Sequence, residues 1–140
     1  IDCLPVLGVL MVNAIAACDH LIIPVQAEHL ALHGLERMVR TVEMMARSRG
    51  AAIHYTVVPT LFDKRTRETF RSFERLQQGF GARLWPGVIP VDTKFREASR
   101  LRLPVTQAFP GARGAAAYQA LADGLLDATA PPPVSLAAAL

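Results

Sequence analysis

The chain has 140 residues, of which 51% are hydrophobic and 19% are charged. A chain of this length forms one domain or part of one, and this balance excludes an intrinsically disordered protein. The net charge of +3 permits contact with nucleic acid or an acidic surface without requiring it. Two cysteines, Cys3 and Cys18, are too few for a disulfide framework, and their apolar neighbours predict buried free thiols in a reducing compartment.

The first long apolar stretch, residues 4–18, raises the question of a membrane segment. It is shorter than the roughly 20 residues that a membrane-spanning helix needs, and Pro5, Gly8 and Asn13 interrupt it. No basic segment precedes it and no polar cleavage region follows it, so a signal peptide is not expected. We therefore expect a cytoplasmic protein that does not enter a membrane.

Three short runs of apolar and β-branched residues predict β-strands. They cover His20–Gln26, Ala52–Phe62 and Leu84–Val91. Because proline has no N–H, Pro59 is expected to end the regular pairing of the second strand.

Segments with helical spacing of apolar residues follow each predicted strand. The first is expected to end at Gly50, and the second at Gly79 or Gly81. The predicted helices cover Leu30–Gly50, Thr66–Gly81, Asp92–Leu101 and 111–128. In the second helix the residues expected to face inward are Phe70, Phe73 and Leu76. In the last helix one apolar stripe contains Tyr118, Leu121, Ala122 and Leu125. Asp92 lies near the N-cap of the third helix.

The alternation of strands and helices predicts an α/β fold, with a parallel sheet and flanking helices. In such sheets ligands lie beyond the carboxyl ends of the strands. Three segments are expected at that edge: 2–8, 60–63 and 90–92. The Pro- and Ala-rich residues 129–140 are predicted to be disordered, which limits the folded part to residues 1–128.

The opening sequence, IDCLPVLG…NAIAACDHLIIPVQAEHLALHGL, resembles the Walker B region of the ParA/MinD-type (Soj-like) partitioning ATPases. These proteins usually have D-C-P-P-S-L-G after an apolar strand, a helix with N-A-L, a strand ending in I-P-V-Q-x-E, and then A-L-x-G-L. The resemblance continues through TLFDKRT, VIPVDTKFREAS and GARGAAAYQALADGLL, so it covers residues 1–127. It implies that residues 1–128 are the C-terminal part of a P-loop NTPase domain of the deviant Walker A type.

The resemblance also implies a nucleotide site. In the family, the aspartate that corresponds to Asp2 ends a buried strand and holds the magnesium shell beside the nucleotide phosphates, so Asp2 is the implied catalytic and metal residue, acting through water. Family residues after later strands contact adenine, and the matching positions here are Thr60, Pro90, Val91 and Asp92. ATP and Mg²⁺ are the implied cofactors.

The chain departs from the family pattern in several places. It contains no phosphate-binding loop of the form G-K-G-G-x-G-K-[ST], whose backbone N–H groups cradle phosphates. We therefore expect no ATP hydrolysis by these 140 residues alone. Val91 and Asp92 stand where many relatives have Arg and Asn, and Leu4 and Val6 replace the usual Pro and Ser after the aspartate.

Arginines at helical spacing predict a basic face on the second helix. Arg67, Arg71 and Arg75 fall at i, i+4 and i+8, and Arg65 lies just before them. Such a stripe suits phosphate contacts on DNA, or it is a solvated face that neighbouring glutamates dilute. The resemblance favours DNA, because the family binds DNA non-specifically through basic residues of this half. A second, weaker cluster contains Lys94, Arg96, Arg100 and Arg102.

His29 and His33 are four residues apart on a predicted helix and could form part of a metal site. Two ligands without a third are a weak signal, and the family uses no metal at this position. We therefore do not expect a metal there.

The resemblance implies a ParA-like ATPase for chromosome or plasmid partitioning. Such a protein forms an ATP-dependent homodimer, binds double-stranded DNA non-specifically, is stimulated by a ParB-like partner, and is cytoplasmic and nucleoid-associated. Two alternatives remain open: a non-catalytic remnant or binding module, and a relative that positions another cellular cargo. An in-frame phosphate-loop sequence upstream would argue against the first, and a neighbouring ParB-like gene would argue against the second.

Overall fold

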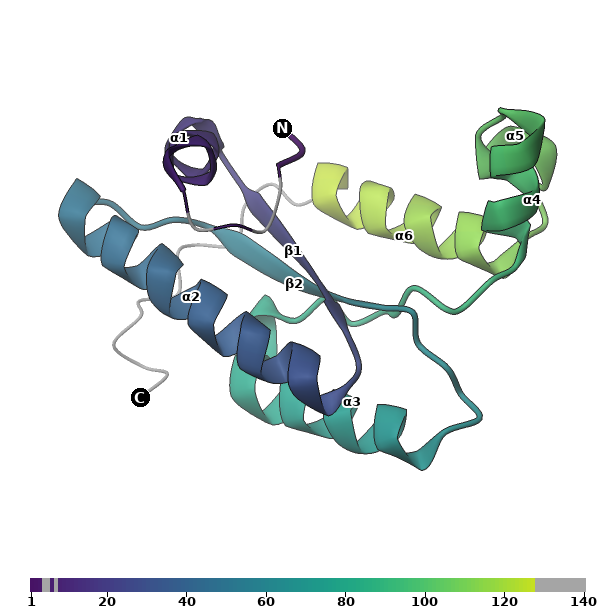
Figure 1. Ribbon diagram of the computed structural model, residues 1–140, viewed down its shortest axis with the longest axis horizontal. Coiled ribbons are helices and arrows are strands. Elements are labelled where there is room, and N and C mark those ends of the chain that lie inside the picture. Colours follow the sequence, from purple (N-terminus) through teal and green to yellow (C-terminus); the bar gives the residue numbers. More distant parts are fainter. Residues whose placement is uncertain (4–5, 7, 128–140) are drawn as a thin grey trace.

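The computed structural model describes residues 1–3, 6 and 8–127, and it has a parallel two-stranded sheet with helices on both sides (Figure 1). Strand β1 (Leu21–Gln26) pairs with β2 (Tyr55–Thr60) in an unbroken parallel register. The long helix α2 (His29–Arg49) connects the two strands, as a parallel pair requires. The predicted α/β class is therefore confirmed.

Helices cover both faces of the sheet. α2 and α3 lie along one face of the sheet, and α6 lies along the opposite face (Figure 1). The bounds of the helices other than α2 are Val9–Ala17 (α1), Arg67–Phe80 (α3), Gly81–Arg83 (the 3₁₀ helix η1), Lys94–Leu101 (α4), Val105–Ala108 (α5) and Arg113–Asp127 (α6).

The larger core lies between the sheet and the pair α2 and α3. Side chains alternate along β1, so Ile23 and Val25 are buried in this core while Ile22 and Pro24 are exposed on the opposite face. Leu76 of α3 is fully buried in the same core. α2 contributes Leu32, Leu35, Val39, Val42 and Ala46. Burial here is spread over many apolar side chains from both strands and both helices.

The ends of α2 and α3 follow from local sequence. α2 ends at Gly50, which has a φ of 68° and donates its N–H to a carbonyl three residues back. α3 begins after Thr66, whose hydroxyl oxygen accepts the N–H of Thr69 at 3.4 Å. Of the two glycines predicted to end α3, it is Gly81 that does so, with a φ of 49°.

The third predicted strand, Leu84–Val91, is wrong as a regular strand. The segment runs along β2 on the side away from β1, and it is bonded at separate points. The N–H of Trp85 donates to the carbonyl of Val57 at 2.9 Å, and the N–H of Ile89 donates to the carbonyl of Pro59 at 2.8 Å. Between these bonds the segment advances four residues while β2 advances two, with a bend at Pro86 and Gly87, and Pro59 has no N–H to donate to the segment, so no continuous ladder forms.

The prediction that Pro59 ends the pairing of β2 is also wrong, because Pro59 lies inside the strand. The carbonyl of Pro59 accepts the N–H of Ile89 on the edge of β2 that faces away from β1. Because the N–H and C=O of one strand residue point the same way, the N–H that Pro59 lacks would also lie on that edge. The N–H of Leu21 points toward β2, and strand alternation therefore puts the missing N–H of Pro24 on the other edge of β1. That edge has no strand partner among the residues that the structure describes.

The predicted inward face of α3 is only partly correct. Leu76 is buried and Phe73 packs against the same core, but the side chain of Phe70 is 47% exposed. Phe70 lies in the first turns of α3, beyond the main core, and its ring packs edge-on against Phe62 with 5.4 Å between centroids.

α6 covers the second face of the sheet incompletely. The predicted stripe on this helix faces the sheet, and Leu121 is buried with Val58 and Ile89 in a small cluster. An open groove of about 350 Å³ remains beside it. It is lined by Ile22, Pro24, Val58, Thr60, Tyr118, Leu121, Ala122 and Leu125. The second face is thus less densely packed than the first.

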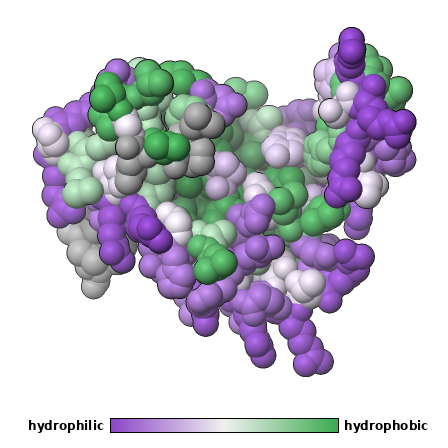
Figure 2. All heavy atoms as spheres, in the orientation of Figure 1, coloured by the Kyte–Doolittle hydropathy of each residue, from purple (hydrophilic) through white to green (hydrophobic). Residues whose placement is uncertain are grey.

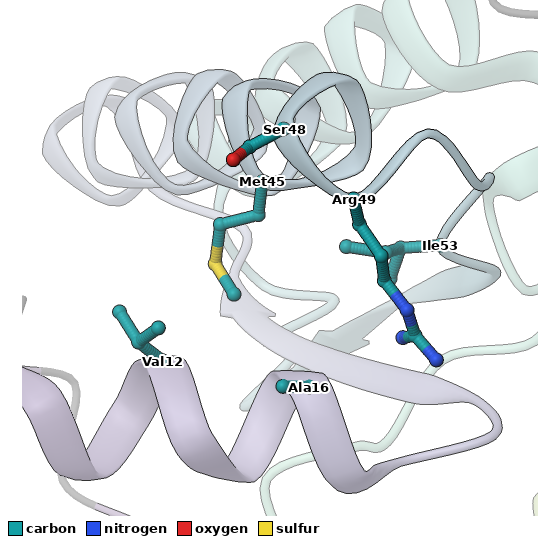
Figure 3. Close-up of a pocket in the computed structure, with 6 residues that line it drawn as sticks. All are labelled: Val12, Ala16, Met45, Ser48, Arg49 and Ile53. Atoms are coloured by element: carbon teal, nitrogen blue, oxygen red, sulfur yellow. The ribbon is translucent and has the colours of Figure 1, made fainter.

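α1 lies beside the end of α2, with a shallow pocket of about 210 Å³ between them (Figure 3). The pocket is lined by Val12 and Ala16 of α1, Met45, Ser48 and Arg49 of α2, and Ile53. Met11 and Ile15 of α1 are buried, while Val9 and Leu10 are largely exposed. Figure 2 shows the resulting gathering of hydrophobic side chains over α1, in contrast to the hydrophilic surface of α2 and α3.

The predicted burial of the two cysteines is wrong. Cys3 is exposed, and Cys18 is partly exposed at the end of α1. Both are free thiols. Only one side of α1 meets the core, so an apolar stretch of sequence does not bury every residue within it.

Some sequence expectations fall beyond what the structure describes. The predicted tail, 129–140, and the last residue of the predicted folded part, 128, lie outside the described residues. Within those residues, no helix has both the length and the hydropathy needed to cross a bilayer.

Candidate functional site

The predicted ligand edge of the sheet is partly assembled by backbone bonds. The N–H of Phe62, two residues after β2, donates to the carbonyl of Ile89 at 3.0 Å. The N–H of Val91 then donates to the carbonyl of Phe62 at 3.2 Å. These bonds place the turn at Pro90 and Val91 beside the end of β2, where Thr60 lies.

The backbone turns sharply at the end of β2. The hydroxyl of Thr60 donates to the carbonyl of Val25 at 3.2 Å and so ties the ends of the two strands together. The next residue, Leu61, has a φ of 49°, a left-handed conformation that is costly for a residue other than glycine. As a result Phe62 is buried while the side chain of Leu61 is 54% exposed.

Asp92 comes directly after the turn at Pro90 and Val91, and its carboxylate caps two helices. Oδ2 accepts the N–H of Gly114 in the first turn of α6 at 3.0 Å, and Oδ1 accepts the N–H of Lys94 at the start of α4 at 2.9 Å. These two bonds, followed by the charges of Arg113 and Lys94, hold the pKa of Asp92 below its usual value. Its predicted place near the start of the third helix is confirmed, and the bond to α6 is additional.

Gly114 allows α6 to approach this turn closely. A Cβ atom at Gly114 would lie 2.3 Å from Cε2 of Phe95 and 3.3 Å from Cβ of Asp92. The ring of Phe95 also packs edge-on against Tyr118, one turn along α6, with 5.7 Å between centroids. A side chain at residue 114 would therefore displace either the ring of Phe95 or the first turn of α6.

Asp2 is exposed, and within the described part of the chain no hydrogen bond or ion pair joins it to Thr60, Pro90 or Asp92. Its carboxylate is the kind of hard oxygen ligand that Mg²⁺ prefers. Across residues 1–3, 6 and 8–127 there is no group of three or more His, Cys, Asp or Glu side chains that could hold a metal. The residues present thus fit a single carboxylate that acts through water, with other ligands coming from elsewhere.

The arginine stripe lies on α3 with its members exposed, as the helical spacing predicted. Arg65 is not free: its guanidinium nitrogen lies 2.7 Å from Oδ2 of Asp63, and this pairing lowers the pKa of Asp63 to about 2. Arg67 and Arg71 have no ion pair within the described residues. Arg75 has no ion pair among these residues either, so the three arginines on α3 all keep an unpaired charge.

Arg75, the last member of the stripe, contacts α2. Its Nη1 lies 3.2 Å from Nδ1 of His29. The ring of His29 is edge-on to that of His33, with 4.8 Å between centroids, and His33 Nδ1 lies 3.8 Å from a carboxylate oxygen of Glu36. The two histidines that share a helix face are thus engaged with an arginine and a glutamate.

The second basic cluster surrounds α4 and is partly neutralised. Nζ of Lys94 lies 2.8 Å from Oε2 of Glu97 and 4.7 Å from the centroid of the Phe109 ring. Arg96 and Arg100 are exposed on the same helix. The cluster therefore presents less free charge than its sequence suggests.

Comparisons with known proteins agree with this architecture. A family model described as "AAA domain" matches residues 1–54. The sporulation initiation inhibitor protein Soj of Bacillus subtilis (strain 168) is 34% identical over 123 residues, which are 87% of this chain and 49% of that protein. The chromosome partitioning protein ParA of Caulobacter vibrioides (strain NA1000 / CB15N) is 34% identical over 123 residues, 87% of this chain and 46% of that protein. The chromosome-partitioning ATPase Soj of Treponema pallidum (strain Nichols) is 32% identical over 123 residues, with 87% and 49% covered.

The parallel sheet with its flanking helices, together with the AAA domain match, defines the class of protein as an α/β chain with the P-loop NTPase fold. Within that class, the chain belongs to the ParA/MinD-like family of partitioning ATPases, which confirms the resemblance seen in its sequence. The chain spans about half the length of the curated relatives that it matches.

Sequence reasoning missed the contacts that hold the candidate site together. The bond from Gly114 to Asp92 joins residues 22 positions apart, and no local pattern reveals it. One signal was present: Gly111 and Ala112, just before α6, have no side-chain oxygen that could cap that helix. The pairing of Asp63 with Arg65 is local, and their spacing of two could have suggested it.

Proposed function

We propose that this chain is the C-terminal part of a ParA-like ATPase domain that acts in chromosome or plasmid partitioning. The observation that carries the proposal is the 34% identity over 123 residues to the Soj protein of Bacillus subtilis and to the chromosome partitioning protein ParA of Caulobacter vibrioides. In this proposal ATP drives formation of a homodimer, and the dimer binds double-stranded DNA without sequence preference. A ParB-like partner stimulates hydrolysis, and the protein works in the cytoplasm on the nucleoid.

The proposed nucleotide lies at the carboxyl end of the sheet. Its base contacts Thr60 and the turn at Pro90 and Val91, and Asp92 belongs to the same turn. Asp2 holds the water shell of Mg²⁺, and that ion neutralises phosphate charge when it is bound. Because the phosphate-binding loop is not among the 140 residues, they supply the base side and one magnesium contact, and we expect no ATP turnover from them alone.

The proposed DNA surface is the face of α3 that carries Arg67 and Arg71. Both side chains are exposed and without an ion pair within the described residues. A homodimer would present two such faces to one duplex, with Arg65 and Arg75 joining when DNA phosphates compete with Asp63 and His29. The net charge of +3 agrees with this surface without requiring it.

The test begins upstream of the gene segment, where an in-frame phosphate-loop sequence is expected. The longer protein should then hydrolyse ATP and bind a non-specific duplex only with ATP. Asp2→Ala should abolish hydrolysis, whereas Asp123→Ala, which changes an exposed carboxylate on α6, should leave it unchanged. DNA binding that ignores ATP would point to the non-catalytic binding module instead. Steady turnover by the 140-residue chain that Asp2→Ala abolishes would contradict the proposed division of the site.

A further inference from the structure

We infer that Asp92 is a positioning residue of the proposed nucleotide site and not a ligand of the base. Its carboxylate holds α4 and α6 together, and this junction sets the turn at Pro90 and Val91 against the end of β2. The assignment to a nucleotide site rests on the proposed function. The role of Asp92 in holding the two helices rests on its own hydrogen bonds.

Both oxygens of the carboxylate are occupied by backbone donors. Oδ1 accepts the N–H of Lys94 at 2.9 Å, and Oδ2 accepts the N–H of Gly114 at 3.0 Å. Neither helix has another side-chain cap: Thr93, the residue before α4, makes no cap hydrogen bond, and Ala112 before α6 has no side-chain acceptor. One carboxylate thus satisfies first-turn N–H groups of two helices, where negative charge is also favoured by both helix dipoles.

The charged groups around the carboxylate favour its ionised form. Arg113 approaches from α6 and Lys94 from α4, and Lys94 is itself paired with Glu97. The backbone hydrogen bonds from Gly114 and Lys94, and after them these charges, lower the pKa of Asp92, so the carboxylate is charged throughout the neutral range. An asparagine here would keep one acceptor oxygen and turn a donor toward the second N–H, so it should retain part of the junction.

The turn that precedes Asp92 is held to the sheet by different bonds. The N–H of Val91 donates to the carbonyl of Phe62 at 3.2 Å, and the N–H of Phe62 donates to the carbonyl of Ile89 at 3.0 Å. Asp92 therefore links a turn fixed to β2 with the first turns of two helices. Without its carboxylate, this segment would lose its hydrogen bond to α6 and keep only the apolar contacts of Ile89 with Leu121 and of Phe95 with Tyr118.

Gly114 offers a way to disturb this junction without changing the carboxylate. Gly114→Ala would place a Cβ atom 2.3 Å from the ring of Phe95, so either this ring, which belongs to α4, or the first turn of α6 has to shift at the junction. Gly124→Ala is the matched control, because a Cβ atom at that position of the same helix meets nothing within 4 Å. If Asp92 contacts the base directly, Gly114→Ala should leave the ATP response unchanged, because that contact does not depend on where α6 lies. If Asp92 acts by holding the helices together, Gly114→Ala should weaken the ATP response.

The experiment uses the 140-residue chain and two readouts. The first is amide hydrogen exchange, in which Asp92→Ala should speed exchange at Lys94, Gly114 and Val91 by roughly fivefold, the loss typical of a missing helix cap. Asp92→Asn should fall between Asp92→Ala and the wild type. The second is titration with ATP, followed by the emission of Trp85, the single tryptophan of the chain, and by the amide shifts of Thr60 and Val91.

The result expected is that Gly114→Ala weakens the ATP response as much as Asp92→Ala does, while Gly124→Ala leaves it unchanged. Phe95→Leu combined with Gly114→Ala relieves the clash, so if α6 has to lie against Asp92 the double variant should fold and should recover the ATP response that Gly114→Ala loses. A full ATP response in Gly114→Ala with a lost response in Asp92→Ala would make Asp92 a ligand and overturn the inference. Unchanged exchange at Lys94 and Gly114 in Asp92→Ala would also overturn it. No ATP response in the wild type, together with altered exchange, would instead count against the proposed nucleotide site.

Discussion

The unit formed by β1, α2 and β2, residues 21–60, and the C-terminal region, residues 84–127, are stabilised in different ways. In the first, a continuous parallel register and a large apolar core hold the strands and α2 together. In the second, isolated backbone bonds, the small cluster around Leu121 and the carboxylate of Asp92 connect the segments to the sheet. Both regions meet at β2: one edge of this strand pairs with β1, and the other edge is hydrogen-bonded to the segment that begins at residue 84.

This difference teaches where change is tolerated. Burial distributed over many side chains averages out the loss of any one polar contact, because apolar contacts are non-directional. A region held by few directional bonds depends on each of them and on close approach at Gly114. The candidate site lies in the C-terminal region, which depends on these few directional bonds. A substitution there can therefore change the geometry of the site while the unit of β1, α2 and β2 stays folded.

The largest expected effect comes from truncating one buried leucine in each apolar cluster: Leu76 of α3, in the core that it shares with β1, α2 and β2, and Leu121 of α6. Leu76→Ala should destabilise the chain by about 3–5 kcal/mol, because Leu76 is fully buried among many partners. Leu121→Ala should cost about 2 kcal/mol, because its cluster borders an open groove. Urea unfolding followed by circular dichroism and by Trp85 emission measures both.

Leu126→Ala serves as the control, since that side chain is 83% exposed and should change stability by less than about 0.5 kcal/mol. Trp85 packs against the Leu121 cluster, so its emission reports on the C-terminal region. If Leu76→Ala and Leu121→Ala lower the free energy of unfolding equally, and both probes give the same transition, the two regions unfold as one unit. That result would contradict the proposed difference between them.

The next prediction asks which region would contact DNA in the proposed ATP-bound dimer. Arg71→Ala on α3 removes two arginines from the dimer, so the slope of log affinity against log salt should fall by about 2, at about 0.9 per phosphate contact. Arg100→Ala on α4 should leave the slope unchanged. Binding isotherms at several salt concentrations decide between them, and an effect of Arg100→Ala alone would move the DNA surface to α4.

A smaller effect is expected from acid, and it should fall on the C-terminal region first. The folded pKa of Asp92 lies below its unfolded value, so its contribution to stability is present above the unfolded value, about 3.9, and is lost as pH falls through the folded pKa. The pKa of Asp63, about 2, acts in the same direction at lower pH. The difference in urea midpoint between the wild type and Asp92→Ala should therefore shrink between pH 7 and pH 3.

The same acid titration has an internal check. If the wild type and Asp92→Ala keep the same difference down to pH 3, the carboxylate does not stabilise the junction through its charge.

The smallest effect on stability is expected at the free edge of β1. Because this edge has no strand partner among the described residues, the 140-residue chain should self-associate at high concentration. Ile22→Lys places a charge on the exposed face beside that edge and should reduce association while changing monomer stability by less than about 1 kcal/mol. Sedimentation velocity over a range of concentrations tests this, and a wild-type monomer at every concentration would contradict it.

The sequence was sufficient for features that depend on local signals. The apolar runs of β1 and β2, the spacing along α2, and the glycines that end α2 and α3 all carry their own physical cause. The family resemblance also placed Thr60, Pro90 and Val91, and the structure brings these residues to one edge. Their binding role remains a prediction.

The rest could not be predicted because it depends on which partner lies opposite. Pro59 stays within its strand because its missing N–H faces away from β1, which no pattern in a single strand specifies. Leu84–Val91 has the composition of a strand, but its bend at Pro86 and Gly87 and the missing N–H of Pro59 restrict pairing to separate points. The contact between Asp92 and Gly114 requires knowing how α6 docks, and that depends on the whole second face of the sheet.

The close packing of Phe95 on Gly114 has a consequence for how such chains evolve. A side chain at residue 114 cannot coexist with an aromatic ring at residue 95 in this geometry. The two positions should therefore covary among homologous sequences: glycine at 114 should accompany a large residue at 95, and a larger residue at 114 should appear only where residue 95 has become small. A lineage that changes one position first passes through an intermediate with a displaced ring or a displaced α6, so substitutions at this junction should be rare and should occur in pairs.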